Sequence, residues 1–244
     1  MLAHAFANAL ASWPGRCELC RGWSAHALCR PCVARHVLRQ PRCVRCALPL
    51  GSAASASVCG RCLRDPPPYE RTVCALDYGF PWDRLIAEFK FGRRTELAAA
   101  LAPLLDDAIA HDAAALRSDL VVVPVPLAPA RLAERGFNQA WELARRLARW
   151  HRLRSRPAAL RRVLAAAPQA ALTRAERERN LRNAFAPAPD AALDGAHVAL
   201  VDDVLTTGTT AREAAAALLR AGAASVRLWV LARTPEPARG PRAQ

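Results

Sequence analysis

Residues 198–210 join an apolar run, two adjacent carboxylates and a turn rich in hydroxyl groups. The segment reads VALVDDVLTTGTT, with Asp202 and Asp203 directly after the apolar run. A parallel strand that ends in two aspartates places both carboxylates at the carboxyl edge of a sheet, where α/β proteins bind their ligands. We therefore expect these carboxylates to accept hydrogen bonds from hydroxyl groups of a ligand.

The hydroxyl-rich loop that follows is suited to binding an anion. It consists of Thr206, Thr207, Gly208, Thr209 and Thr210. The backbone N–H groups and hydroxyls of such a turn can surround a phosphate, and the helix expected from about Ala211 adds its positive N-terminal end. One ligand satisfies both halves of the motif: a ribose 5-phosphate whose ring hydroxyls reach the two aspartates.

Two plainer interpretations of this motif stay open. Adjacent aspartates after a strand also hold metal ions, as in response regulators and Walker B sites, and threonines before a helix also serve as caps. Neither interpretation requires all thirteen positions in this order, and the chain contains no glycine-lysine Walker A pattern. The motif therefore favours the ribose phosphate.

Eight of the nine cysteines form four C-x2-C pairs. They are Cys17 and Cys20, Cys29 and Cys32, Cys43 and Cys46, and Cys59 and Cys62. Two such pairs complete a tetrahedral site, so the spacing predicts two structural zinc ions and no catalytic one. Disulfides are the alternative, but no secretion signal supports them, and a redox C-x-x-C motif is expected once rather than four times. Sequential pairing is the simplest arrangement, and interleaved pairing stays open.

The chain is strongly basic, with a formal net charge of +14. Residues 1–66 carry nine arginines against Glu18 and Asp65, a formal +7 that falls to about +3 if each of two four-thiolate zinc sites contributes a net −2. Residues 145–162 add eight arginines, no acid and a neighbouring Trp150. Such a segment binds single-stranded nucleic acid or is simply a solvated helix face, and both readings stay open.

Composition divides the chain into three parts. We expect a double zinc ribbon at 1–66, an α/β domain at 67–234 and a disordered tail at 235–244, with a proline-rich linker at the first boundary. In the α/β part, continuous apolar runs alternate with segments of helical periodicity, which predicts a parallel, doubly wound sheet. The strands are expected at residues 72–78, 119–126, 197–203 and 225–232.

Two further features bear on function. Lys90 is the only lysine beside 34 arginines, and its compact ammonium is not interchangeable with a guanidinium. The apolar runs are too short and too interrupted by charge for membrane insertion, so we expect a cytoplasmic protein.

The motif at residues 198–210 resembles the phosphoribosyl-pyrophosphate signature of type I phosphoribosyltransferases. With the cysteine pairs, the whole chain resembles the ComF family of competence-associated proteins over about residues 15–234. Further similar stretches are LIAEFKFG (85–92), VVPVPLAPARLAERGFNQA (122–140) and PQAALTRAERERNLRNAF (168–185). The resemblance implies a type I phosphoribosyltransferase-like fold that binds phosphoribosyl pyrophosphate together with Mg²⁺.

The resemblance also implies roles for individual residues. Asp202 and Asp203 would be the catalytic pair in a displacement at the anomeric carbon. Arg131 and Arg135 would contact the pyrophosphate, because a guanidinium fork matches phosphate oxygens. A loop at about residues 165–180 would close over the reacting centre and exclude water.

Two functional classes remain after this reading. The first is an enzyme that uses phosphoribosyl pyrophosphate, with an unidentified acceptor. The second is a DNA-binding or adaptor protein that keeps the same pocket as a ligand sensor. The resemblance implies work in natural competence with single-stranded DNA and competence proteins, and the candidate DNA contacts are Arg149, Arg152 and Arg154.

Overall fold

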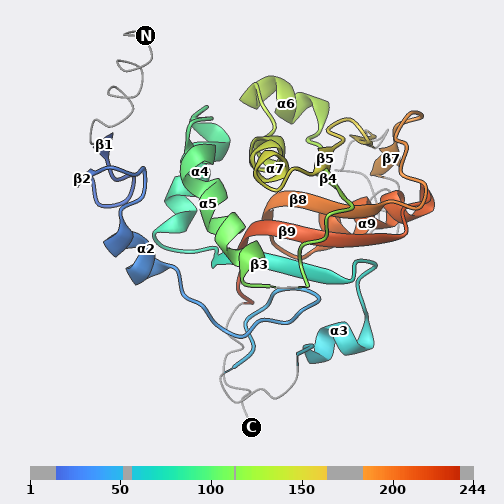
Figure 1. Cartoon of the computed structure of the whole chain (residues 1–244), viewed down its shortest axis with the longest axis horizontal. Coiled ribbons are helices and arrows are strands. Elements are labelled where there is room, and N and C mark those ends of the chain that lie inside the picture. Colours follow the sequence, from blue (N-terminus) through green and yellow to red (C-terminus); the bar gives the residue numbers. More distant parts are fainter. Residues whose placement is uncertain (1–14, 52–56, 113, 164–183, 237–244) are drawn as a thin grey trace, which may run out of the picture.

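The computed structural model describes residues 15–51, 57–112, 114–163 and 184–236. Its centre is a parallel sheet of five strands in the order β3-β9-β8-β4-β5 (Figure 1). The strands are β3 (Arg71–Asp77), β4 (Leu120–Pro124), β5 (Arg154–Ser155), β8 (His197–Leu205) and β9 (Ser225–Arg233). The predicted parallel sheet is confirmed, and the acidic pair lies on its middle strand.

Helices cover both faces of the sheet. One face packs against α4 (Trp82–Phe91), α5 (Leu97–Ala110) and α7 (Gln139–Trp150). The other packs against α9 (Thr209–Arg220) and a small antiparallel pair, β6 (Leu160–Arg162) and β7 (Phe185–Pro187). In β9, Trp229 and Leu231 face the first layer while Leu228 and Val230 face the second. This alternation buries the strand on both sides, which is why its sequence is almost continuously apolar.

The order of the strands creates one site for a ligand. The chain runs from β4 outward to β5 and then returns to β8 on the opposite side of β4. In open α/β sheets, ligands bind where the strand order reverses, outside the carboxyl ends of the two strands. Here these ends carry the acidic pair and the hydroxyl-rich loop on one side, and α6 (Pro129–Arg135) on the other.

Hydrogen bonds join the cysteine-rich module to the sheet domain. Its elements are β1 (Gly15–Arg16), β2 (Trp23–Ser24), α2 (Arg30–His36) and α3 (Gly60–Arg64). The Trp82 indole N–H donates to the His36 carbonyl at 3.0 Å, which joins α2 to α4. The Thr72 N–H donates to the Val44 carbonyl at 2.8 Å, so the chain around the third cysteine pair lies along the outer strand β3.

The observed elements differ from the expected ones at several boundaries. β8 continues past the acidic pair, because Val204 and Leu205 still pair with Ala232 and Arg233 of β9. α9 begins at Thr209 rather than near Ala211, since Gly208 takes the left-handed conformation (φ 85°) and serves as its N-cap. The elements α6, β5, β6 and β7 were not anticipated, because each is too short to show a hydrophobic period.

Two further expectations concern the closing loop and the C-terminal tail. The predicted closing loop at 165–180 lies outside the described residues, as does most of the expected tail. Within the described part of the chain, no helix has both the length and the apolar character needed to cross a membrane.

Candidate phosphoribosyl site and cysteine clusters

The two aspartates are held by the backbone that follows them. The Asp203 N–H donates to Asp202 Oδ1 at 2.9 Å, and the Val204 N–H donates to Asp203 Oδ1 at 2.7 Å. Asp203 is only 4% exposed, and its Oδ2 has no hydrogen-bond partner among the described residues. A buried acceptor without a partner is costly, so this oxygen is a candidate ligand contact.

The lone lysine lies against this pair. Lys90 Nζ is 3.4 Å from Asp203 Oδ1, and both side chains are mostly buried. Lys90 sits in the last turn of α4, which ends at Gly92, where a Cβ atom would approach the Glu88 carbonyl oxygen to 2.6 Å. The sequence marked Lys90 only as chemically unusual; its place at the acidic pair depends on how α4 packs beside β8.

The pKa of the Asp202 side chain is far above the usual value for a carboxyl group. Burial and the adjacent Asp203 raise the pKa of Asp202, Lys90 opposes both effects, and the resulting value is about 8. Between about pH 4 and pH 8 the folded protein therefore keeps a proton that the unfolded chain has released. The free energy of unfolding falls as the pH rises through this window, so Asp202 lowers stability at neutral pH, which is typical of a functional group.

Asp202→Asn is expected to remove the loss of stability that accompanies ionisation of Asp202. The amide oxygen can still accept the Asp203 N–H, and no charge has to be buried at high pH. We expect the variant to match wild type near pH 4 and to exceed it at pH 8.5 by at least about 1 kcal/mol, since one unit of pKa corresponds to about 1.4 kcal/mol. Urea unfolding of both proteins across this range measures the difference. Parallel pH profiles for the two proteins would contradict it.

The hydroxyl-rich loop is shaped around Gly208. Its positive φ of 85° is a conformation that favours glycine, and an added Cβ would lie 3.7 Å from the Tyr69 hydroxyl oxygen. The hydroxyls of Thr207 and Thr209 are hydrogen-bonded at 3.0 Å, while Thr206 and Thr210 are exposed. The loop thus presents hydroxyls and the first N–H groups of α9 beside the acidic pair, which is the arrangement expected for binding a phosphate.

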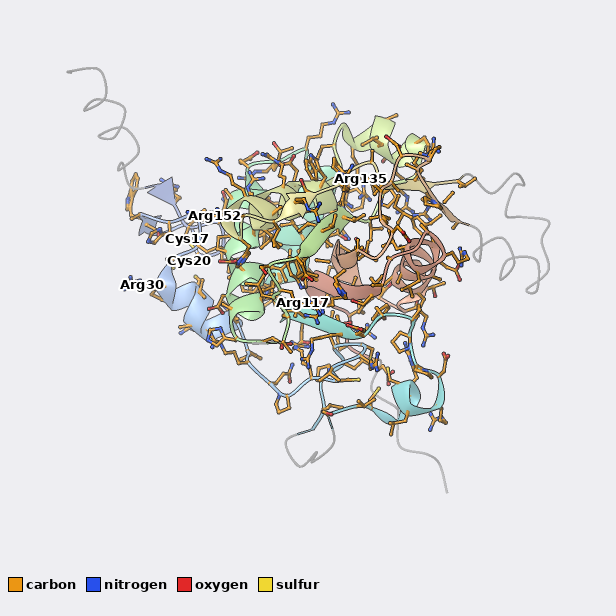
Figure 2. The ribbon with its side chains drawn as sticks, turned by 45° about the vertical axis from the view of Figure 1, so that its right-hand side comes forward. Cys17, Cys20, Arg30, Arg117, Arg135 and Arg152 are labelled. Atoms are coloured by element: carbon orange, nitrogen blue, oxygen red, sulfur yellow. The ribbon has the colours of Figure 1, made fainter. Side chains whose placement is uncertain are left out.

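The two predicted arginines differ in their surroundings. Arg131 is exposed at the start of α6, whereas Arg135 is 6% exposed with its guanidinium 4.7 Å from the ring centroid of Phe91. Arg135 Nε has no partner among the described residues. Figure 2 shows Arg135, the last residue of α6, well apart from Cys17 and Cys20. Arg135 therefore packs as a buried cation against Phe91.

Arg162 is a further basic residue near the acidic pair. Burial lowers the pKa of Arg162, the nearby Arg131 lowers it further, and Asp202 acts in the opposite direction. These charges therefore lie within electrostatic reach of one another. In the sequence, Arg162 is recognisable only as part of a basic run, because a strand as short as β6 gives no local sign that it lies near the acidic pair.

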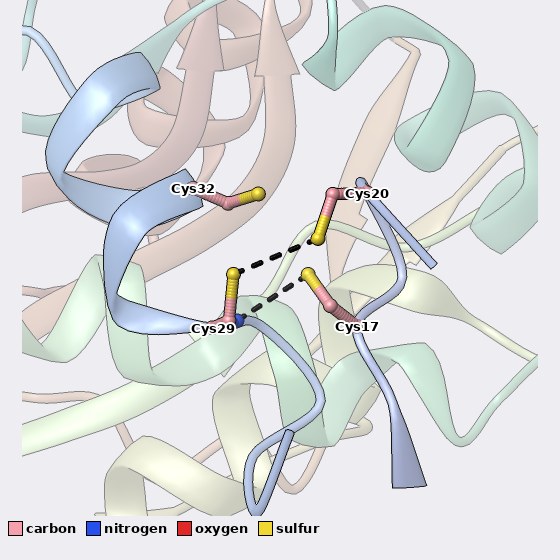
Figure 3. Close-up of side chains that lie close together, drawn as sticks. All are labelled: Cys17, Cys20, Cys29 and Cys32. Carbon is pink, nitrogen blue, oxygen red and sulfur yellow. Dashed lines mark hydrogen bonds between the residues drawn. The ribbon is translucent and has the colours of Figure 1, made fainter. Parts of the chain in front are cut away.

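The cysteines form two groups with sequential pairing. The first cluster is Cys17, Cys20, Cys29 and Cys32, and the second cluster is Cys43, Cys46, Cys59 and Cys62. Figure 3 shows the first cluster. The Sγ atoms of each cluster lie within 4.8 Å of one another, and all nine cysteines are free thiols. This grouping decides between the sequential and interleaved pairings that the sequence left open.

The distances within each cluster fit a zinc ion. Cys20 Sγ lies 3.8 Å from Cys29 Sγ, and Cys46 Sγ lies 3.6 Å from Cys59 Sγ. A tetrahedron with Zn–S bonds of about 2.3 Å has sulfur atoms about 3.8 Å apart. In both clusters the first pair lies on a turn and the second pair lies at the start of a short helix, α2 or α3. Each cluster could hold one zinc ion.

The pKa values of the cysteine thiols also indicate a metal site. Burial acts to raise the pKa of Cys17, but the backbone N–H donors of Cys29, Cys20 and Leu19 together outweigh it and bring the value to about 6. For Cys32, burial and the neighbouring sulfur atoms raise the pKa to about 12. Four thiolates therefore cannot coexist here without a cation, so the donor set suits a metal ion that deprotonates its ligands.

Comparison with known proteins identifies relatives over most of the chain. The Phosphoribosyl transferase domain family matches residues 132–244. DNA utilization protein YhgH is 41% identical in Salmonella typhimurium and 40% identical in Escherichia coli K12, covering 91% of this chain and 98% of each relative. Competence protein F of Haemophilus influenzae is 34% identical, covering 89% of this chain and 96% of that protein.

Among solved structures, the chain is similar to a glutamine phosphoribosylpyrophosphate amidotransferase from B. subtilis. The identity is 20% and the TM-score 0.41, and the likeness covers 59% of this chain and 30% of that one. The relatives identified by sequence are far more similar and match nearly end to end. With its phosphoribosyl transferase domain and its two four-cysteine clusters, the chain belongs to the ComF family.

Proposed function

We propose that the chain binds phosphoribosyl pyrophosphate with Mg²⁺ outside the carboxyl ends of β4 and β8. The observation that carries this proposal is the acidic pair, with Lys90 on one side and the hydroxyl-rich loop on the other. Asp202 and Asp203 would accept hydrogen bonds from the ribose hydroxyls. The loop and the N-terminus of α9 would hold the 5-phosphate.

The same residues suit a displacement at the anomeric carbon. Pyrophosphate would leave as the bond to carbon breaks, and the Asp203 carboxylate would stabilise the positive charge that develops on the sugar, joined by Asp202 where the pH is high enough to ionise it. Arg162, which lies within electrostatic reach of Asp202, and the nearby Arg131 would neutralise the leaving group, and Mg²⁺ bound with the ligand would supply further positive charge there. These roles require the substrate but no particular acceptor.

Binding and turnover are tested separately. Calorimetric titration with phosphoribosyl pyrophosphate in the presence of Mg²⁺ tests the ligand, and the absence of binding rejects the proposal. A pyrophosphate-release assay across a panel of bases and amines then separates the two classes. Turnover with any acceptor identifies an enzyme, while binding without turnover favours a ligand sensor, since phosphoribosyltransferase-like folds can serve functions other than catalysis.

A second candidate function is binding of single-stranded DNA during competence. The names of the relatives refer to DNA utilization and to competence. Arg149, Arg152, Arg154 and Arg156 are exposed, and none of their guanidiniums pairs with a carboxylate within the described residues. Trp150 beside them is 46% exposed. Unpaired arginines beside an exposed indole suit phosphate contacts and base stacking.

Neutralising this surface is expected to weaken DNA binding. For Arg149→Gln, Arg152→Gln and Arg154→Gln combined, we expect at least a tenfold loss of affinity for a labelled single-stranded oligonucleotide at low salt. The salt dependence should also become shallower by up to about two units in a log–log plot, because each lost phosphate contact on a single strand contributes about 0.7. Fluorescence anisotropy at several salt concentrations measures both quantities.

The control removes the same charge elsewhere. Arg84, Arg117 and Arg220 are exposed on other elements, and changing all three to glutamine gives an equal change in net charge. If both triple variants lose the same affinity, the protein responds only to net charge. If the Arg149/Arg152/Arg154 variant binds as tightly as wild type, these arginines form a solvated helix face and do not contact DNA.

A further inference from the structure

A buried arginine joins the second cluster to the hydroxyl-rich loop. Arg233, the last residue of β9, is 2% exposed. Its Nε donates to the Cys46 carbonyl at 2.9 Å, and its Nη1 donates to the Leu205 carbonyl at 2.9 Å and to the Thr206 carbonyl. One rigid guanidinium thus fixes the distance between a cysteine of the cluster and the point where β8 enters the loop.

A second arginine of the module contacts the middle of the loop. Arg61 lies in α3 between Cys59 and Cys62, and its Nη2 donates to the Thr207 carbonyl at 3.0 Å. The contact links the helix that begins at the second cluster to the turn that is expected to hold the phosphate. Because an intact cluster fixes the start of α3, it also fixes the position of Arg61.

Two more contacts surround the same turn. Arg45 lies between Cys43 and Cys46, and its Nη1 donates to the Tyr69 carbonyl at 3.0 Å. Tyr69 is 2% exposed and its hydroxyl lies beside Gly208, the N-cap of α9. At the other end of the turn, Arg212 in the first turn of α9 donates to the Asp65 carbonyl at 2.7 Å. The module therefore contacts the entry, the middle and the exit of the loop.

The charge of an occupied cluster supports the buried guanidinium. Within the described residues Arg233 bonds only to carbonyl oxygens and pairs with no carboxylate. A buried cation without an opposite charge is unfavourable. A zinc ion with four thiolates has a net charge of −2, and the second cluster places that charge next to Arg233.

The first cluster has no comparable link. Within the described residues, its neighbourhood contacts α4 and the turn after it: Trp82 bonds to the His36 carbonyl, and Arg94 pairs with Glu18 at 2.8 Å. None of the hydrogen bonds found there reaches residues 205–212. The two clusters have the same four-cysteine composition, but within the described part of the chain only the second is hydrogen-bonded to the hydroxyl-rich loop through its neighbouring residues.

We propose that zinc at the second cluster holds the hydroxyl-rich loop in its anion-binding conformation through Arg233 and Arg61. Loss of that ion releases the loop, whereas loss of the ion at the first cluster does not. Because coupling between the affinities of two sites is reciprocal, a phosphate ligand bound at the loop raises the affinity of the second cluster for zinc. Only this ligand-dependent half rests on the proposed function.

The first experiment needs no ligand. Amide hydrogen exchange is followed at residues 206–212 in wild type, in Cys59→Ser/Cys62→Ser and in the matched Cys29→Ser/Cys32→Ser. We expect at least tenfold faster exchange in the second-cluster variant and no change in the first-cluster variant, since opening of the loop is local. Equal exchange in both variants overturns the proposal.

Two arginine variants test the same link without removing any cysteine, so the test does not depend on whether the cysteine variants fold. Arg233→Met and Arg61→Ala leave all eight cluster cysteines in place, so both should retain the zinc content of wild type. We expect faster exchange at residues 206–212 in both, larger for Arg233, with unchanged exchange in β3. Unchanged loop exchange in Arg233→Met at full zinc content overturns the proposal.

The second experiment tests reciprocity. The zinc affinity is measured at equilibrium by competition with a chelating dye, with and without phosphoribosyl pyrophosphate and Mg²⁺. We expect the ligand to raise the zinc affinity of the second cluster at least fivefold in wild type and in Cys29→Ser/Cys32→Ser, but not in Arg233→Met. A ligand that binds by calorimetry without changing the zinc affinity overturns the coupling. If no ligand binds, the proposed function fails, and the exchange experiment still decides the role of the cluster.

Discussion

Replacing Asp203 with alanine is expected to lower the affinity for phosphoribosyl pyrophosphate with Mg²⁺ by at least about 100-fold. A hydrogen bond to a charged group contributes about 1.5–3 kcal/mol, and about 2.7 kcal/mol corresponds to a factor of 100. Asp203 is buried at the switch point, and its Oδ2 has no partner within the described chain, so this oxygen is available to a ligand. The alanine variant also leaves Lys90 without its partner carboxylate.

Calorimetry of both proteins measures this effect, and two variants serve as controls. Asp203→Asn keeps the shape of the side chain and removes the charge, so it should also bind weakly if the charge is what matters. Asp119→Ala removes an exposed carboxylate that pairs with Arg117 at 2.8 Å, far along the chain from the acidic pair, and should bind normally. Equal affinity of Asp203→Ala and wild type would reject the proposed site.

Removing the zinc ligands is expected to have the largest effect on stability. Protein purified without chelator should contain about two zinc ions per chain, because eight cysteines fill two tetrahedra. Structural zinc contributes about 10–16 kcal/mol of binding free energy in small zinc domains. We therefore expect Cys43→Ser/Cys46→Ser to lose one ion per chain and to unfold at least about 10 °C below wild type, since 1 kcal/mol shifts the midpoint of a domain of this size by about 2–4 °C.

The ninth cysteine provides the matched control. Cys74 belongs to neither cluster, and its Sγ donates to the Leu76 carbonyl at 3.1 Å, a bond that a serine hydroxyl can replace. Cys74→Ser should retain both ions and nearly the thermal midpoint of wild type. Metal analysis and thermal unfolding of the three proteins give the comparison. A zinc content near zero together with intact disulfides in wild type would refute the metal sites.

The sequence by itself determined the features that depend on local pattern. Continuous apolar strands that alternate with helical segments require a sheet covered on both faces, and the structure has that parallel sheet. The C-x2-C spacing brings sulfur atoms together within one turn of chain, so the number of metal sites follows from counting pairs. The acidic-threonine motif is contiguous along one strand and the loop after it, so its parts are neighbours in almost any fold that contains them.

Tertiary structure decided everything that joins distant segments. The pairing of the cysteines, the position of Lys90 at Asp203 and the raised pKa of Asp202 all depend on which elements pack against β8. The contacts of Arg233 span 187 positions in the chain to Cys46, and nothing in the local sequence distinguishes it from the other 33 arginines. Local patterns follow from the periodicity of the backbone, whereas distances between strand ends follow from strand order. Strand order is therefore what placed the second cluster beside the loop.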